Sequence, residues 1–281
     1  MRKTVATALV AVSFHSPAWA DPDLPISKWR VDFEDAQCVA TRDFGNAATP
    51  ITMALKLPPI GRELQLSVFI SRAHPGALRQ IDGSIAINDG EAVKTTLLSY
   101  DPPTGTRHVY RLNLTSSGAD ALEKASSLRL SAGKELNQRF ADPQIGPALK
   151  VLDTCISDLR DAWNIGPDGA KSSTLRTHAS AGDFESLFTS RDLPQAGIGL
   201  NYAAPVGFVM LIDEAGRIAD CTVTETSGGA ALDAQSCAVP MRLAKFKPAV
   251  GVDGHPARDF YSFRVNWRFG MEVLRRPGKG N

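Results

Sequence analysis

Few side chains in this chain have the types and spacing that catalysis or metal binding requires. The histidines after residue 20 are His74, His108, His178 and His255. None is separated from another histidine, a cysteine or a carboxylate by the spacing of a metal site or a catalytic triad. No G-x-S-x-G motif and no complete G-x-G-x-x-G loop occur. The sequence therefore predicts a protein that is not an enzyme and uses no cofactor or metal, although a triad assembled only by the fold stays open.

Charged residues point to no particular substrate. Asp32, Glu34 and Asp35 could supply a carboxylate pair, but a solvated strand edge is the simpler interpretation. The chain has 281 residues, of which 43% are hydrophobic and 22% are charged, which suits two ordinary cores. Loss of Arg2 and Lys3 with a leader would leave 29 basic against 30 acidic residues. Nothing in this balance favours a nucleic-acid partner.

The four cysteines fall two in each half of the chain, at Cys38, Cys155, Cys221 and Cys237. Four cysteines allow three connectivities. We expect Cys221 to pair with Cys237 and Cys38 with Cys155, since each bond would then stay within one half. Loops of these sizes stabilise a fold by about 3 and nearly 5 kcal/mol in the chain-entropy model. Buried free thiols remain an alternative, and a zinc site is disfavoured because no C-x-x-C motif occurs.

The cysteines of the second half lie on a predicted hairpin and helix. An apolar run from Val206 to Ile212 and a β-rich run from Arg217 to Thr226 flank a turn that contains Gly216. After a break at Ser227 to Gly229, residues 230–243 have helical spacing. The apolar face of this helix that we expect to pack on the hairpin comprises Ala234, Cys237, Ala238 and Met241.

A final strand is predicted over residues 259–269, where apolar and polar residues alternate. Its predicted core face comprises Tyr261, Phe263, Val265, Trp267 and Phe269. Its predicted wet face comprises Ser262, Arg264, Asn266 and Arg268. Because the strand closes the unit, we expect it at the edge of a small sheet, where its unpaired backbone could accept an extended peptide. The alternative is that the segment around Leu193 to Tyr202, or a second copy of the domain, already covers this edge.

The second half resembles a known family through four segments in a characteristic order and spacing. They are Gly216 to Gly228, Leu232-Asp233, Phe246 to Ala249 and Asp253 to Pro256. Together they are similar to the carboxy-terminal domain of TonB-family proteins, over about residues 193 to 270. The resemblance implies a small β-β-α-β domain whose last strand receives a receptor's TonB box as an added strand. Ser262, Arg264, Asn266 and Arg268 are then the candidate binding residues.

The chain departs from the plan of energy-transducing TonB proteins at its start and at its middle. Residues 1–20 have the basic opening, short apolar run and A-x-A ending of a signal peptide, so we expect cleavage after Ala20. Residues 164–192 contain one proline, Pro167, and we expect a linker there rather than a proline-rich spacer. If the signal were retained as an anchor, the transducer interpretation would return.

The first half, residues 21–163, reads as a β-rich domain closed by a helix, so the predicted class is α+β. Eight short strands are expected in it, together with a short helix over residues 117–124. A long helix is expected over residues 145–162. Trp29 and Trp163 are expected to fill the core rather than to bind a ligand, and residues 271–281 are expected to form a solvated tail.

These patterns predict a periplasmic binding or adaptor protein that grips a peptide, such as a receptor's TonB box, in outer-membrane transport. The competing prediction is a structural envelope protein that pairs with itself as a homodimer or binds peptidoglycan. Neither prediction involves a membrane-spanning segment after residue 20.

Overall fold

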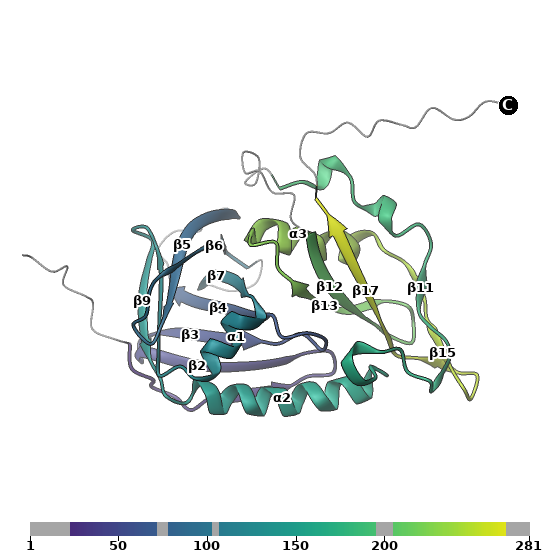
Figure 1. Ribbon diagram of the computed structural model, residues 1–281, viewed down its shortest axis with the longest axis horizontal. Coiled ribbons are helices and arrows are strands. Elements are labelled where there is room, and N and C mark those ends of the chain that lie inside the picture. The colour runs from purple at the N-terminus through teal and green to yellow at the C-terminus, as the bar shows by residue number, and fades with distance from the viewer. Residues whose placement is uncertain (1–22, 72–77, 103–106, 195–204, 268–281) are drawn as a thin grey trace, which may run out of the picture.

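The computed structural model describes residues 23–71, 78–102, 107–194 and 205–267 (Figure 1). Its first half is a large antiparallel sheet with two helices, and its second half is a small three-stranded sheet with one helix. The α+β class and the β-rich first domain with a terminal helix are thereby confirmed.

Nine strands form the large sheet in the order β1-β2-β3-β4-β7-β6-β5-β8-β9. Their bounds are β1 Arg30–Phe33, β2 Cys38–Asn46, β3 Thr49–Lys56, β4 Leu64–Ser71, β5 Arg79–Ile87, β6 Val93–Tyr100, β7 Arg107–Leu114, β8 Ser127–Ala132 and β9 Leu136–Ala141. Strand β2 alternates buried and half-buried residues, as a sheet with one core face requires. The β5–β6 turn places Asn88 and Asp89 at positive φ, which these residue types tolerate better than most.

The two ends of this sheet are bridged by residues 23–26. The Asp23 N–H donates to the Arg139 carbonyl of β9 at 2.6 Å, and the Gly45 N–H of β2 donates to the Leu24 carbonyl at 2.9 Å. The sheet therefore curls back on itself and encloses an apolar core.

Helix α1, Ser116–Glu123, and helix α2, Ile145–Ala162, cover the core, and α2 runs beneath β2 in Figure 1. The predicted stripe of α2 is buried: Leu149, Leu152, Ile156 and Leu159. Trp163 is also fully buried, and its indole N–H donates to the Asp35 carbonyl at 2.7 Å, whereas Trp29 is half-buried against the same core.

The small sheet has the order β13-β12-β17, with β12 Pro205–Ile212, β13 Ile218–Glu225 and β17 Asp259–Asn266. Helix α3 spans Ala230–Leu243, as predicted. The hairpin turn needs Gly216, which has φ +77° and whose Cβ, if present, would meet the Phe246 carbonyl oxygen at 2.3 Å. The β-β-α-β order of the predicted domain is thus present.

The apolar face predicted for α3 packs on the hairpin only in part, through Cys237, which is bonded to Cys221 of β13. Leu232 and Val239 are the fully buried α3 residues in the core of the small sheet. Ala238 and Met241 are exposed, and together with Ala234 and Cys237 they line a cavity that opens toward the large sheet. Helix α3 is apolar on two faces because it lies between two sheets.

Residues 164–192, for which we expected a free linker, instead run along the second domain. Strand β10, Leu175–Thr177, pairs with β15, Ala249–Gly251, and strand β11, Ser180–Ala181, pairs with β14, Phe246–Lys247. Strand β16, Pro256–Ala257, completes the β10-β15-β16 sheet. Three short 3-10 turns complete the segment: Pro167–Gly169, Glu185–Leu187 and Ser190–Asp192.

Aromatic packing holds this segment in place. Phe184, 4% exposed, lies 4.8 Å from Phe263 and 5.2 Å from Tyr261 between ring centroids, and Phe188 stacks on Phe263 at 5.8 Å. Backbone pairing and ring contacts together explain why the segment does not behave as a coil.

Candidate functional site

The predicted binding strand, β17, lies at the edge of the small sheet. It pairs antiparallel with β12 over eight residues, from Asp259 opposite Ile212 to Asn266 opposite Pro205. Within the described part of the chain, β12 is the only strand that pairs with β17. Among the described residues, which leave out 195–204, no strand pairs with the other side of the β17 backbone, so that side could accept another strand.

Two hydrogen bonds show which β17 residues face outward. In the hairpin turn, the Asp213 N–H donates to the Arg217 carbonyl at 2.9 Å and therefore points toward β13. Because neighbouring residues of a strand direct their backbone groups to opposite sides, Ile212, Met210 and every second residue of β12 direct theirs toward β17. On β17 itself, the Phe260 carbonyl accepts a hydrogen bond from the Lys171 ammonium, which comes from outside the small sheet. Since backbone direction alternates, Ser262, Arg264 and Asn266 present their N–H and C=O groups at the open edge.

The side chains of these three residues are exposed and lie on the polar face, as predicted. Arg264 reaches across Gly207 of β12 to the Glu225 carboxylate of β13 at 2.6 Å. A Cβ at Gly207 would lie 2.9 Å from the Glu225 Cβ, so glycine leaves the room for this cross-strand contact. Arg268 and Phe269 lie outside the described residues.

The start of β17 is fixed by a fully buried carboxylate. Asp259 accepts hydrogen bonds from the Ala179 N–H at 2.8 Å and from Lys171 at 3.2 Å, and His178 Nδ1 lies 3.3 Å away. Burial lowers the pKa of Lys171, and the nearby Asp259 carboxylate opposes that shift. The segment before the domain thus anchors one end of the edge strand.

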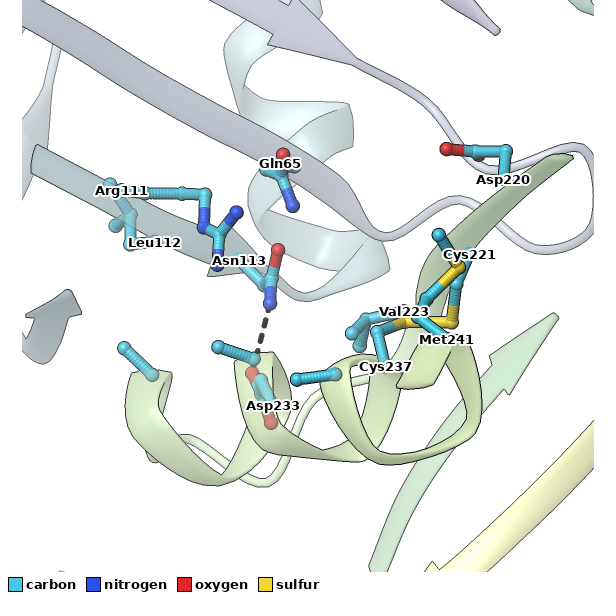
Figure 2. A pocket seen from close by; sticks show the side chains of 13 residues that line it. Gln65, Arg111, Leu112, Asn113, Asp220, Cys221, Val223, Asp233, Cys237 and Met241 are labelled. Atoms are coloured by element: carbon cyan, nitrogen blue, oxygen red, sulfur yellow. Dashed lines mark hydrogen bonds between the residues drawn. A yellow bond between two sulfur atoms is a disulfide. The ribbon is translucent and has the colours of Figure 1, made fainter. Parts of the chain in front are cut away.

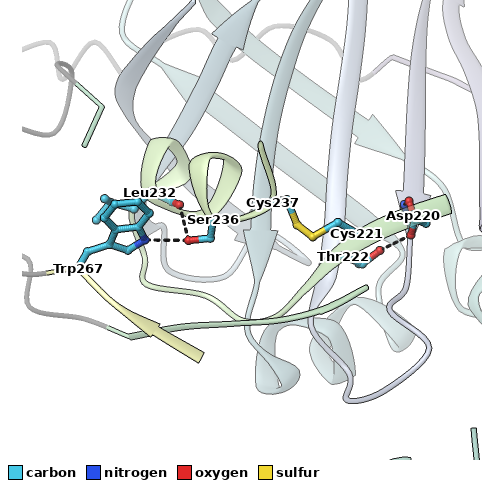
Figure 3. The surroundings of a disulfide bond; sticks show 8 residues. Asp220, Cys221, Thr222, Leu232, Ser236, Cys237 and Trp267 are labelled. Carbon is cyan, nitrogen blue, oxygen red and sulfur yellow. Dashed lines mark hydrogen bonds and ion pairs between the residues drawn. A yellow bond between two sulfur atoms is a disulfide. The ribbon is translucent and has the colours of Figure 1, made fainter. Parts of the chain in front are cut away.

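The other end of β17 is tied to α3. Trp267, 4% exposed, donates its indole N–H to the Ser236 hydroxyl at 2.8 Å, and that hydroxyl donates to the Leu232 carbonyl at 2.9 Å (Figure 3). Helix α3 is in turn bonded to β13 by the Cys221–Cys237 disulfide, with a Cα–Cα distance of 5.7 Å. The carboxy-terminal end of β17 is therefore held by α3, which the disulfide in turn fixes to β13.

Both disulfides have the predicted pairing. Cys38 on β2 bonds to Cys155 on α2 with a Cα–Cα distance of 6.0 Å, so neither bond joins the two halves. The acidic cluster is a surface feature: Asp32 pairs with Arg30 at 3.2 Å, Glu34 accepts from Gln37 at 2.6 Å, and the Asp35 side chain is 91% exposed. Its carboxylates do not converge on a common site.

One arrangement that the sequence spacing did not reveal is a Ser-His-Asp relay inside the first domain. The Ser99 hydroxyl lies 2.8 Å from His108 Nε2, and His108 Nδ1 lies 2.7 Å from the Asp101 carboxylate. These residues come from β6, the end of β6 and β7, so the hairpin brings them together. A signal was available, since Ser99, Asp101 and His108 fall on one face of that predicted hairpin.

The relay lacks access for a substrate. Ser99 and His108 are both 0% exposed, and the His108 ring packs edge-on against Tyr110 at 4.7 Å between centroids. A nucleophile must meet its substrate, so this geometry supports a buried hydrogen-bond network rather than catalysis.

Metal-site and membrane signals were also sought in the described residues. They contain no cluster of three or more histidine, cysteine, aspartate or glutamate side chains arranged to hold a metal ion. None of the described helices is long and apolar enough to cross a bilayer.

Comparison with known proteins agrees with the geometry of the second domain. Residues 191–270 match the family described as Gram-negative bacterial TonB protein C-terminal. No curated protein and no solved structure matches the chain. The described part of this matched segment has the β-β-α-β order that the resemblance implies, so its fold agrees with that of a TonB C-terminal domain.

Proposed function

We propose that this protein is a periplasmic TonB-like adaptor that binds an extended peptide segment, such as a receptor's TonB box, as an added strand beside β17. The observation that carries the proposal is the open edge of β17, at which Ser262, Arg264 and Asn266 present backbone donors and acceptors. The TonB C-terminal match links the domain to envelope transport and supports a protein partner.

The charge of the edge suits an acidic or polar peptide. Arg264 is paired with Glu225, but the two side chains are 59% and 44% exposed, and an exposed pair of this kind contributes at most about 1 kcal/mol. A peptide carboxylate can therefore compete for the Arg264 guanidinium. We include Arg268 in the binding strand on the same alternation.

Proline substitution tests the role of the backbone. Ser262→Pro and Arg264→Pro each remove one outward N–H without removing a hydrogen bond to β12, and edge strands tolerate proline on their open side. We expect both variants to keep the fold and to weaken binding of receptor peptides about fivefold, as measured by calorimetry, because each lost bond is worth about 1 kcal/mol.

Alanine at the same positions is the matched control, since Ser262→Ala and Arg264→Ala remove the side chains and keep the N–H groups. Equal binding by the proline and alanine variants would contradict strand addition. No binding of any receptor peptide at micromolar concentration, together with binding to isolated peptidoglycan, would favour the structural alternative. A homodimer lost in both proline variants would show that a second copy occupies the edge.

A further inference from the structure

A cavity of about 300 Å³ lies between the two domains, away from the β17 edge (Figure 2). One wall is the outer face of β4 and β7, with Gln65, Arg111 and Asn113. The opposite wall is α3 and the neighbouring β13, with Ala234, Ala238 and Met241. The volume is at the lower end of the range for small-molecule sites.

The polar wall holds a cation that has no ion pair in the described residues. Arg111 is half-buried, its guanidinium lies 5.4 Å from the Tyr100 ring centre, and no carboxylate of the described chain is within ion-pair distance of it. The Gln65 side chain is also half-buried and makes no hydrogen bond to another described residue. Two donor groups thus line the cavity without a hydrogen-bond partner among the residues that the structure describes.

The two acids of the lining are already occupied. Asp233, 1% exposed, accepts hydrogen bonds from the Asn113 amide at 3.0 Å, from the Ser227 N–H at 2.8 Å and hydroxyl at 2.7 Å, and from the Thr226 hydroxyl. Asp220 is paired with Lys56 at 2.6 Å. Arg111 is therefore the one charged side chain of the lining that has no hydrogen-bond or ion-pair partner among the described residues.

The rest of the lining is apolar. Ala234, Ala238 and Met241 face the cavity from α3, and Met241 is 51% exposed although it is a large hydrophobic residue. The Cys221–Cys237 disulfide and Val223 extend this apolar wall. An apolar wall opposite a single guanidinium matches a ligand with one negative charge and a short hydrocarbon body.

We infer that this cavity binds a small carboxylate with an apolar chain, with the carboxylate on Arg111 and Gln65 and the chain against Ala238 and Met241. A dianion such as phosphate fits less well, because one guanidinium neutralises only one of its charges. The site is separate from the peptide edge, so its test does not depend on the peptide proposal.

Octanoate is a suitable probe, and calorimetry on the purified chain should detect its binding. Octylamine, which has the opposite charge, and inorganic phosphate, which has no apolar body, should bind at least tenfold more weakly. In a ¹⁵N-labelled sample, octanoate should shift the side-chain amide signals of Gln65 and Asn113 and leave the Ser262 to Asn266 amides unchanged.

Arg111→Gln should reduce octanoate affinity tenfold or more, since a charge-assisted hydrogen bond is lost. Arg176→Gln is the matched control, because Arg176 is exposed on β10 and makes the same charge change outside the cavity. Ala238→Trp should reduce affinity without any change of charge, and its exposed helical position tolerates a larger side chain.

Several outcomes would overturn the inference. They are the absence of octanoate binding, equal loss of affinity in Arg111→Gln and Arg176→Gln, and tighter binding of octylamine than of octanoate. Shifts confined to Ser262 to Asn266 would place octanoate at the peptide edge and would also overturn it.

Discussion

The Lys56 ammonium of β3 lies 2.6 Å from the Asp220 carboxylate of β13, and the two side chains are only 14% and 15% exposed. This ion pair joins the large sheet to the TonB-like domain. Asp220 also accepts a hydrogen bond from the Thr222 hydroxyl at 2.7 Å, so one carboxylate links both sheets. Val209, Leu211 and Phe260 of the small sheet, which pack into the core of the first domain, lie on the same side.

We expect Lys56→Met to destabilise the protein by about 1–3 kcal/mol, because it leaves the Asp220 carboxylate shielded from water with only a hydroxyl partner. Urea unfolding of Lys56→Met, Asp220→Asn and the double variant measures this as a double-mutant cycle. The double variant should be less destabilised than the sum of the single variants. Strict additivity would show that the pair contributes no coupling.

The Cys221–Cys237 bond gives a second stability prediction. Cys237→Ser should lower the free energy of unfolding by about 2–5 kcal/mol, the range for a native disulfide in a small domain. Wild-type protein unfolded under reducing conditions is the matched control and should lose a similar amount, with a further loss from Cys38–Cys155. A variant as stable as the oxidised wild type would contradict the bracing role of this disulfide.

Asp192 provides a pH prediction. Its carboxylate accepts from the Thr189 hydroxyl at 2.7 Å, and this bond is the main reason that the pKa of Asp192 lies below its ordinary value of 3.8. Burial opposes the shift, while the Thr189 N–H and Arg242 add to it. At a pH just below 3.8, Asp192 is protonated less often in the folded protein than in the unfolded protein. Its contribution is therefore complete above about pH 4 and is lost as the pH falls through the lowered pKa.

The corresponding variant is Asp192→Asn, which keeps an acceptor but has no charge. We expect it to be less stable than wild type at pH 6 by up to about 1 kcal/mol and to approach wild-type stability near pH 2. Urea unfolding at the two pH values measures the difference. A gap that stayed constant between pH 6 and pH 2 would show that the charge of Asp192 is unimportant.

The buried Ser99–His108–Asp101 network predicts that the Ser99 hydroxyl is unreactive. A fluorophosphonate probe, which labels accessible activated serines, should not label Ser99, because Ser99 and His108 are both 0% exposed. Ser99→Ala should instead cost about 1–3 kcal/mol of stability by leaving a ring nitrogen of His108 without this partner. Labelling of the wild type that disappears in Ser99→Ala would establish a reactive serine and contradict the non-enzymatic interpretation.

Regular periodicity explains which elements could be predicted. Helices α2 and α3 were predicted with their observed bounds, and the alternation of Tyr261 with Ser262 along β17 gave its two faces. Strand β9 was missed because three polar residues separate Leu136 and Phe140, its two buried apolar residues, so the sequence shows no alternation of apolar and polar residues there.

Contacts between distant segments could not be predicted. The packing of Phe184 and Phe188 on β17 could not be predicted, because two aromatic residues in a polar segment do not indicate which distant strand they contact. The two apolar faces of α3 likewise do not say which sheet each one meets. The cavity at Arg111 depends on that choice, so it appears only when both domains are in place.

The bridge formed by residues 23–26 has a consequence for the kinetics of folding. These residues pair beside β9 and β2, and the Cys38–Cys155 bond, 117 positions apart, spans nearly the same length of chain. Contacts of such sequence separation form late, because a long loop must close before they contribute. We therefore expect the segment that is synthesised first in this domain to become ordered among the last, after β9 and α2 have emerged and packed.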